Sequence, residues 1–187
     1  MAITTKFGDK GKTMILFGHV VDKTHPILDV VGTIDELSAN IGIARASVVA
    51  PGLKQELLNI QKKLFIIGAE VATREEDFSK LKQTIQAQTI QEIEEEIEKL
   101  EEYNNIDNWS IPGENLSSAF IEKSRTVARR LERRIIQQQH HNEQTRLYLN
   151  RLSDYLWLLA QKEEYYLRGV EKQSTEPVSN QKQQTIF

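Results

Sequence analysis

The sequence contains no cysteine among its 187 residues. This absence excludes disulfide bonds, thiolate metal sites, iron–sulfur clusters and a cysteine nucleophile. Glycine and proline are also scarce, with nine and four copies, which is about 7% of the chain where average usage gives about 12%. A β-sandwich or barrel uses these two residues in its many turns. Their scarcity therefore favours a few long elements.

An excess of one charge and a long apolar run are missing as well. Lys and Arg number 24 against 27 Asp and Glu, a net charge of −3, which is too near neutral for a protein that binds nucleic acid through bulk charge. No stretch approaches the roughly 18 consecutive apolar residues of a membrane-spanning helix, and the first residues lack the apolar core of a signal peptide. We therefore expect a cytoplasmic protein with no nucleic-acid or membrane partner.

The sequence does have helical periodicity. Between Leu53 and Thr73, apolar residues recur at spacings of 4-3-4-3-4, which is typical of the buried seam of a helix bundle. Similar patterns predict five helices, over residues 33–49, 53–73, 89–103, 117–139 and 143–168. Because most of their connections are short, we predict an all-α fold, an up-and-down five-helix bundle with an irregular N-terminal arm.

Local sequence signals set the predicted ends of these helices. The runs Thr33–Glu36 and Thr89–Glu92 have the form of capping boxes, and Gly169 is suited to end the last helix. The chain is then one domain in three parts: an N-terminal arm at 1–31 with a short extended piece at 14–17, a helical bundle at 32–169, and a mobile polar tail at 170–187. Residues 74–88 are predicted to form an exposed polar connection.

The arm contains the run TKFGDKGKT at residues 5–13. Its two glycines allow the backbone to turn N–H groups toward an anion, while three lysines and two threonines supply charge and hydroxyls. The spacing differs from that of a Walker phosphate loop, and no strand precedes it. Two readings stay open, a phosphate cradle and a flexible, solvated basic segment.

Arginines gather on the predicted helix 117–139. Arg125, Arg129 and Arg133 recur every four residues and share one face, and Arg130 and Arg134 form a parallel row. Such a cluster repels itself unless carboxylates or a polyanion neutralise it. The helix thus either makes salt bridges with its neighbours or binds phosphate groups, for which the planar guanidinium is suited.

Four runs, in this order, carry a resemblance: TKFGDKGKT at 5–13, VGTIDEL at 31–37, SRTVARRLERR at 124–134 and YLNRLSDYLW at 148–157. Together they resemble the PduO-type ATP:cob(I)alamin adenosyltransferases, also called corrinoid adenosyltransferases, over about residues 3–165. The resemblance implies a homotrimer of helical bundles with active sites at the subunit interfaces. It also implies the reaction, in which cob(I)alamin attacks the ribose 5′-carbon of ATP to give adenosylcobalamin and triphosphate.

The resemblance further implies the residues of the site. For ATP binding these are Thr5, Lys6, Phe7, Gly8, Asp9, Lys10, Gly11, Thr13, Met14, Lys23, Arg129, Arg130, Glu132, Arg133 and Asn150. Arg129 would stabilise the charge that develops on the leaving triphosphate, and Asp35 and Arg125 would form a pair that closes the site across the subunit boundary. Trp109 would lie beside the corrin of cobalamin. Mg²⁺ would be carried by ATP without a protein side chain as ligand, cobalamin would be a substrate, and a reductase that supplies Co(I) would be a partner.

The chain departs from the family pattern mainly in the half that would face the corrin. Glu114 follows Pro112-Gly113 where a second glycine is usual, Glu122 stands where a histidine is usual, and the glycine pair after the first motif is Gly18-His19. These departures keep an alternative open, a catalytically inactive helical bundle of the same fold that binds ATP or a protein partner. A third reading is an unrelated scaffold whose arginines bind another polyanion. Whether Glu114 and Glu122 line the corrin pocket or face solvent separates the first two.

Overall fold

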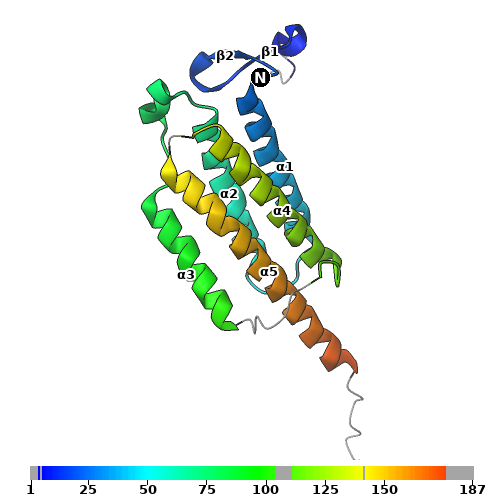
Figure 1. Cartoon of the computed structure of the whole chain (residues 1–187). Helices are drawn as coiled ribbons and strands as arrows, with labels where there is room; N and C mark the ends of the chain where they lie inside the picture. Colours follow the sequence, from blue (N-terminus) through cyan, green and yellow to red (C-terminus); the bar gives the residue numbers. More distant parts are fainter. Residues whose placement is uncertain (1–3, 5, 104–110, 141, 176–187) are drawn as a thin grey trace, which may run out of the picture.

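The structure is a computed structural model that describes residue 4 and residues 6–103, 111–140 and 142–175. Five long helices form its body, α1 (Pro26–Ser47), α2 (Leu53–Val71), α3 (Ala87–Tyr103), α4 (Leu116–Gln137) and α5 (Glu143–Thr175). Helix α4 packs against α1 and α5, α2 covers α1, and α3 covers α5 (Figure 1). The predicted all-α five-helix bundle is confirmed.

The core lies where the apolar faces of α1, α2, α4 and α5 meet. The six seam residues of α2 are all buried, namely Leu53, Leu57, Ile60, Leu64, Ile67 and Val71. They lie in one cluster with Leu131 of α4 and Leu149 and Leu156 of α5. Since burial of each such side chain contributes about 1.5–3 kcal/mol, the seam fixes the helices that carry the polar residues described below.

The start of α1 differs from the prediction. The helix begins at Pro26, and the ring Nδ1 of His25 caps it by accepting a hydrogen bond from the Ile27 amide at 3.2 Å. Thr33 is therefore inside the helix, and its hydroxyl donates to the Asp29 carbonyl at 2.6 Å. The predicted capping box is wrong here because a proline at the first helical position and a cap before it already start the helix. Residues 26–31, predicted as arm, are helical.

Two other helix ends also differ. Helix α3 begins at Ala87, so Thr89 lies in its first turn and is not the residue before it. Helix α5 passes through Gly169 and continues to Thr175, so the glycine does not end it, and residues 170–175, predicted as part of the tail, are helical. A glycine in an exposed helix costs only about 1 kcal/mol relative to alanine, which a long helix tolerates. Residues 176–187 lie outside the described residues.

The connection between α2 and α3 is docked onto the bundle, whereas the sequence predicted an exposed one. It contains a short 3-10 helix, η3 (Glu75–Lys80), and it buries Asp77 and Ile85. The amide of Ile85 donates to the carboxylate of Glu70, a fully buried residue of α2, at 2.5 Å. A buried carboxylate inside α2 thus ties this connection down, which apolar periodicity alone does not reveal.

The arm is a small β-hairpin that sits at the N-terminal end of α1 (Figure 1). It consists of η1 (Phe7–Lys10), β1 (Lys12–Met14), η2 (Leu16–Gly18) and β2 (Val20–Asp22). The two strands pair antiparallel, with Lys12 opposite Asp22 and Met14 opposite Val20. The extended piece predicted at 14–17 is displaced, since the strand ends at Met14 and a 3-10 turn follows.

Among the helices of the described ranges, none is long and apolar enough to cross a membrane.

Candidate active site

The open end of the hairpin brings Lys23 back onto the glycine-rich run. The Lys23 amide donates to the Gly11 carbonyl at 2.8 Å. Gly11 has a φ of 74°, a left-handed conformation that favours glycine. A Cβ placed on Gly8 would lie 2.8 Å from the Lys23 ammonium. The missing side chain at Gly8 is therefore what lets the lysine lie against the backbone of η1.

This end of the arm is strongly cationic. Lys6, Lys10, Lys12 and Lys23 are all exposed, and none of them forms an ion pair with a carboxylate within the described part of the chain. Exposed lysines on and beside a turned backbone are suited to a polyanion such as a chain of phosphates. The ordered turn is compatible with a phosphate cradle, which stays a prediction.

Three of the five arginines on α4 already have partners. The guanidinium of Arg130 donates to the Glu36 carboxylate of α1. Arg134 donates to the Asp29 carbonyl at 2.8 Å and to the Thr33 hydroxyl. Both therefore link α4 to α1, Arg130 through a salt bridge and Arg134 through hydrogen bonds to neutral groups. Arg125, the third, donates from Nε to the Glu122 carboxylate on its own helix at 2.7 Å.

The other two arginines, Arg129 and Arg133, are exposed and have no hydrogen-bond or ion-pair partner among the residues that the structure describes. Glu132 lies between them, and its carboxylate accepts from the Asn150 side chain on α5 at 3.0 Å. The structure thus brings together four of the residues that the resemblance assigned to the site. Two uncompensated guanidinium groups on one face are available to an anion.

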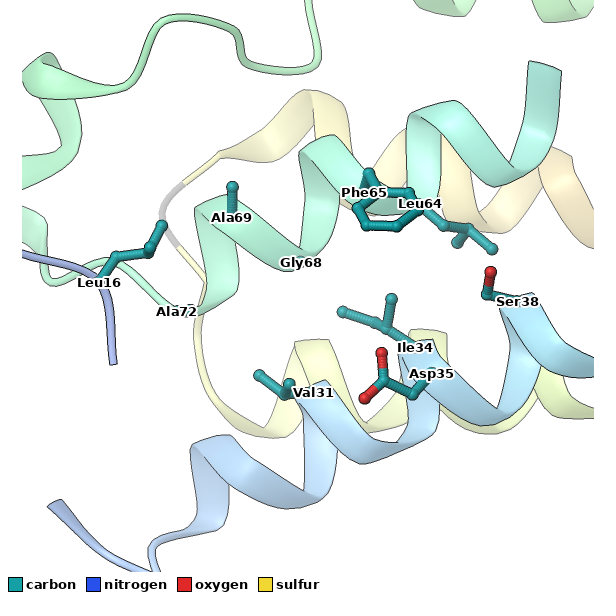
Figure 2. Close-up of a pocket in the computed structure, with 10 residues that line it drawn as sticks. All are labelled: Leu16, Val31, Ile34, Asp35, Ser38, Leu64, Phe65, Gly68, Ala69 and Ala72. Atoms are coloured by element: carbon teal, nitrogen blue, oxygen red, sulfur yellow. The ribbon is translucent and has the colours of Figure 1, made fainter. Parts of the chain in front are cut away.

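Asp35 is exposed on α1 and lines a groove between α1 and α2 with a volume of about 320 Å³. Figure 2 shows Asp35 and Ile34 on one wall and Leu64 and Phe65 on the other. Phe65 is 77% exposed, although it lies next to a seam residue. Within the described part of this chain Asp35 has no ion-pair partner, and Arg125 is engaged by Glu122. No motif in the sequence indicates this groove.

The two acidic departures from the family pattern have different surroundings. Glu122 is buried, 3% exposed, and its charge is paired with Arg125. Glu114 is half exposed and accepts from Arg168 at 2.5 Å. Neither carboxylate is an isolated charge. A corrin pocket beside them would therefore be lined by two ion pairs and not by two unpaired negative charges. Thr5 and Trp109, both predicted site residues, lie outside the described residues.

The described residues contain no group of three or more His, Asp or Glu side chains that could hold a metal ion.

Two adjacent buried glutamates of α5 differ in how their oxygens are satisfied. Glu163 accepts hydrogen bonds from the Val49 and Ala50 amides and from the Ser117 hydroxyl, at 2.7 to 3.3 Å. Glu164 accepts one from the Ser118 hydroxyl at 2.9 Å. Its second oxygen is buried without a hydrogen bond within the described residues and meets only the exposed Arg168 guanidinium, at 3.7 Å. A carboxylate with so few donors is expensive to keep charged.

We therefore predict that Glu164→Gln stabilises the chain near neutral pH. Burial raises the pKa of Glu164, and the charges of Glu114 and Glu122 add to this effect, which outweighs the opposing effects of the Ser118 hydroxyl and Arg168. A group with a raised folded-state pKa contributes full stability below its ordinary value of 4.5 and loses it as the pH rises through the folded pKa. Glutamine cannot ionise, so the variant does not lose this stability as the pH rises. Thermal melts should show a Tm gain of a few degrees at pH 7 and almost none at pH 4.

The matched control is Glu163→Gln, in which the side-chain NH₂ group would face the N–H and O–H donors that the carboxylate now accepts from. It should lower the Tm at pH 7, because one of the amides that the Glu163 carboxylate now satisfies would be left unpaired. An equal Tm change for both variants would contradict this distinction between the two glutamates.

Comparisons with known proteins give the same family at three levels. The family model described as cobalamin adenosyltransferase matches residues 3–163. A curated corrinoid adenosyltransferase of Citrobacter freundii is 38% identical over 166 residues, which cover 87% of this chain and 94% of that protein. The corrinoid adenosyltransferase PduO of the same organism is 33% identical over 88% of this chain, which spans only half of that longer relative. The human corrinoid adenosyltransferase MMAB is 35% identical over 84% of this chain and 67% of its own length.

Solved structures are similar along almost the whole chain. A variant of the PduO-type ATP:corrinoid adenosyltransferase from Lactobacillus reuteri, complexed with cobalamin and ATP, has a TM-score of 0.82 and 29% sequence identity. The match covers 89% of this chain and 96% of that one. Another variant of the same protein, complexed with ATP, has the same TM-score and 30% identity.

Proposed function

The chain belongs to the cobalamin adenosyltransferase family, and on that premise we propose that it transfers the 5′-deoxyadenosyl group of ATP to cob(I)alamin. The Co(I) centre supplies the electron pair that forms the bond to the ribose 5′-carbon. The C5′–O bond breaks, and its electrons leave with triphosphate. Since cobalt is the nucleophile, the protein needs no general base. Its task is to hold both substrates and to stabilise the leaving group.

The observation that carries the proposal is the division of the α4 arginines. Arg130 and Arg134 are used to bind α1, whereas Arg129 and Arg133 are exposed and uncompensated. Negative charge accumulates on triphosphate as the C5′–O bond lengthens, and a guanidinium already in place lowers that barrier. We assign Arg129 to the leaving group and Arg133 to the phosphates. Glu132 and Asn150, which hold each other, would contact the nucleotide beside them.

The arm would bind the rest of ATP. We propose that its lysines and turned backbone hold the triphosphate, through Thr5, Lys6, Gly8, Asp9, Lys10, Gly11, Thr13 and Lys23. Phe7 and Met14 are apolar side chains that are about half exposed, and a bound nucleotide would cover them. Mg²⁺ would enter on the phosphates, as it commonly does when substrate oxygens supply its ligands. Arg130 would touch ATP only by leaving Glu36, so we place it at the edge of the site.

We further propose that the chain acts as a homotrimer with each active site between two subunits. Asp35 lacks a partner in its own chain, and Arg125 uses only Nε toward Glu122, so its terminal amino groups can reach a carboxylate of a neighbour. The apolar groove beside Asp35, with Phe65 exposed, is a surface that a second subunit would cover. Trp109 beside the corrin, a reductase partner and a cytoplasmic location stay predictions from the sequence.

Anaerobic incubation with MgATP and chemically reduced cobalamin tests the reaction. The optical spectrum should change as the Co–C bond forms, and one triphosphate should be released for each adenosylcobalamin. A chain that binds MgATP yet forms no Co–C bond under these conditions would be the inactive bundle of the same fold.

Gly8→Ala should weaken ATP binding several-fold while leaving the fold intact. The new methyl group would displace the Lys23 ammonium, which is the flexible end of a side chain and can move at little cost to stability. Calorimetric titration with MgATP and thermal melts measure the two effects. Gly169→Ala is the control for the affinity, because its Cβ would meet nothing within 4 Å, and its Tm should rise slightly, since alanine favours a helix over glycine. Unchanged affinity in Gly8→Ala would remove Lys23 from the cradle.

A further inference from the structure

The two ends of the arm hairpin are held in different ways. The open end, with η1 and Lys23, carries the cationic groups. The closed end, from Ile15 to His19, lies against the connection between α2 and α3. There the Leu16 amide donates to the Ala72 carbonyl at the end of α2, at 3.0 Å. The hairpin is thus attached to the bundle at its turn, away from the residues proposed to bind phosphate.

The backbone of this turn is unusual. Phe17 has φ 60° and ψ 21°, and Gly18 has φ 85°, so two successive residues adopt the left-handed conformation, which is unfavourable for a side chain such as that of Phe17. The Ile15 amide donates to the His19 carbonyl at 2.9 Å and closes the turn. Such a conformation persists only when surrounding contacts fix it. The contacts must therefore come from what the turn lies against.

One buried carboxylate provides them. Asp77 of η3 is 6% exposed. Its Oδ2 accepts from Nε2 of His19 at 2.5 Å, and its Oδ1 accepts from the Lys80 ammonium at 2.5 Å. That ammonium lies 5.6 Å from the centroid of the Phe17 ring, within the range of a cation–π contact. The hydrogen bonds from Lys80 and His19 hold the pKa of Asp77 below its ordinary value, so the carboxylate is charged.

We propose that His19, Asp77 and Lys80 form a latch that positions the arm for ATP without touching the nucleotide. The proposal rests on the proposed function, because it assumes that the arm binds ATP. A segment that must be ordered when its ligand arrives binds more weakly than one already in place. A latched turn keeps the register of the two strands and so keeps Lys23 beside η1. Chemistry at the 5′-carbon depends on α4 and is untouched by the latch.

The test compares His19→Gln and Asp77→Asn with the control Glu76→Gln, which changes an exposed acid of the same 3-10 helix. Hydrogen exchange of the amides in residues 12–22 is first measured on the chain without nucleotide. We expect at least about tenfold faster exchange in both latch variants and no change in the control. The Kd for MgATP should then rise about tenfold, while kcat at saturating ATP stays within about twofold of wild type.

The outcomes separate the latch from the proposed function. Unchanged exchange in His19→Gln, which leaves Asp77 and Lys80 in place, overturns the latch whatever ATP does. Faster exchange with an unchanged Kd overturns its positioning role. A wild-type chain that fails to bind MgATP overturns the proposed function, and with it the role of the latch in nucleotide affinity. If the latch exists, adding His19→Gln to Asp77→Asn should have no further effect on exchange, since the partner is already lost.

Discussion

Replacement of Arg129 by alanine is expected to lower kcat for adenosyl transfer by about a hundred- to a thousandfold, the usual loss when one donor to a developing anion is removed. The affinity for ATP should fall only a few-fold, because Lys23, the other arm lysines and Arg133 still meet the phosphates. The reason is the timing of the charge. Ground-state ATP already carries its phosphate charges, whereas the charge on the oxygen that leaves C5′ appears only as the bond breaks.

Single-turnover kinetics with preformed cob(I)alamin, together with calorimetric titration of MgATP, measure the two quantities separately. Arg129→Lys is the matched variant, since it keeps the charge and loses the planar fork, and its kcat should lie between those of wild type and alanine. Equal losses of kcat and affinity in Arg129→Ala would make this arginine a ground-state binding residue. The leaving-group role would then have to move to Arg133.

The helical body could be predicted because its signal is repeated many times along the chain. Six residues at 4-3 spacing on α2 leave little choice about which face is buried, and all six are buried. Helix ends carry no such repetition. Thr33 has the sequence of a cap, yet Pro26 and His25 start the helix earlier. Strands of three residues, such as β1 and β2, show no period at all, so the hairpin was predicted only as an irregular arm.

The candidate site was predicted at the level of residue types and motifs. Five arginines on one helix indicate either ion pairs or phosphate binding, and sequence cannot divide them, because the division depends on Glu36 and the Asp29 carbonyl of another helix. The latch on Asp77 was missed for a related reason. A single aspartate in a polar segment reads as solvated, and only the fold brings His19 to it across 58 residues.

Asp35 and Arg125 give the second large expected effect, because a site between subunits is lost with the interface. Asp35→Arg should place like charges opposite each other, weaken the trimer so that it dissociates in sedimentation at low protein concentration, and lower turnover at least about a hundredfold. Arg125→Gln removes the positive charge of the pair, and it should weaken the trimer and lower turnover in the same way without unfolding the chain. The glutamine amide nitrogen stands as many bonds from the backbone as Nε of arginine, so it can keep the hydrogen bond to Glu122. Glu98→Arg, an equal charge change on the exposed face of α3, is the control and should alter neither property.

Coexpression of the two inactive variants with different tags tests whether the pair is intermolecular. A site that takes Asp35 from an Arg125→Gln subunit and Arg125 from an Asp35→Arg subunit has both native side chains. In a closed ring of three subunits that contains both variants, one of the three sites has both native side chains, so purified mixed trimers should regain up to about a third of the wild-type activity. If Asp35 and Arg125 served a site within one chain, every subunit of the mixture would carry a defect in its own site. Mixed trimers without activity would therefore place the site inside the subunit, and recovered activity requires that two subunits build it together.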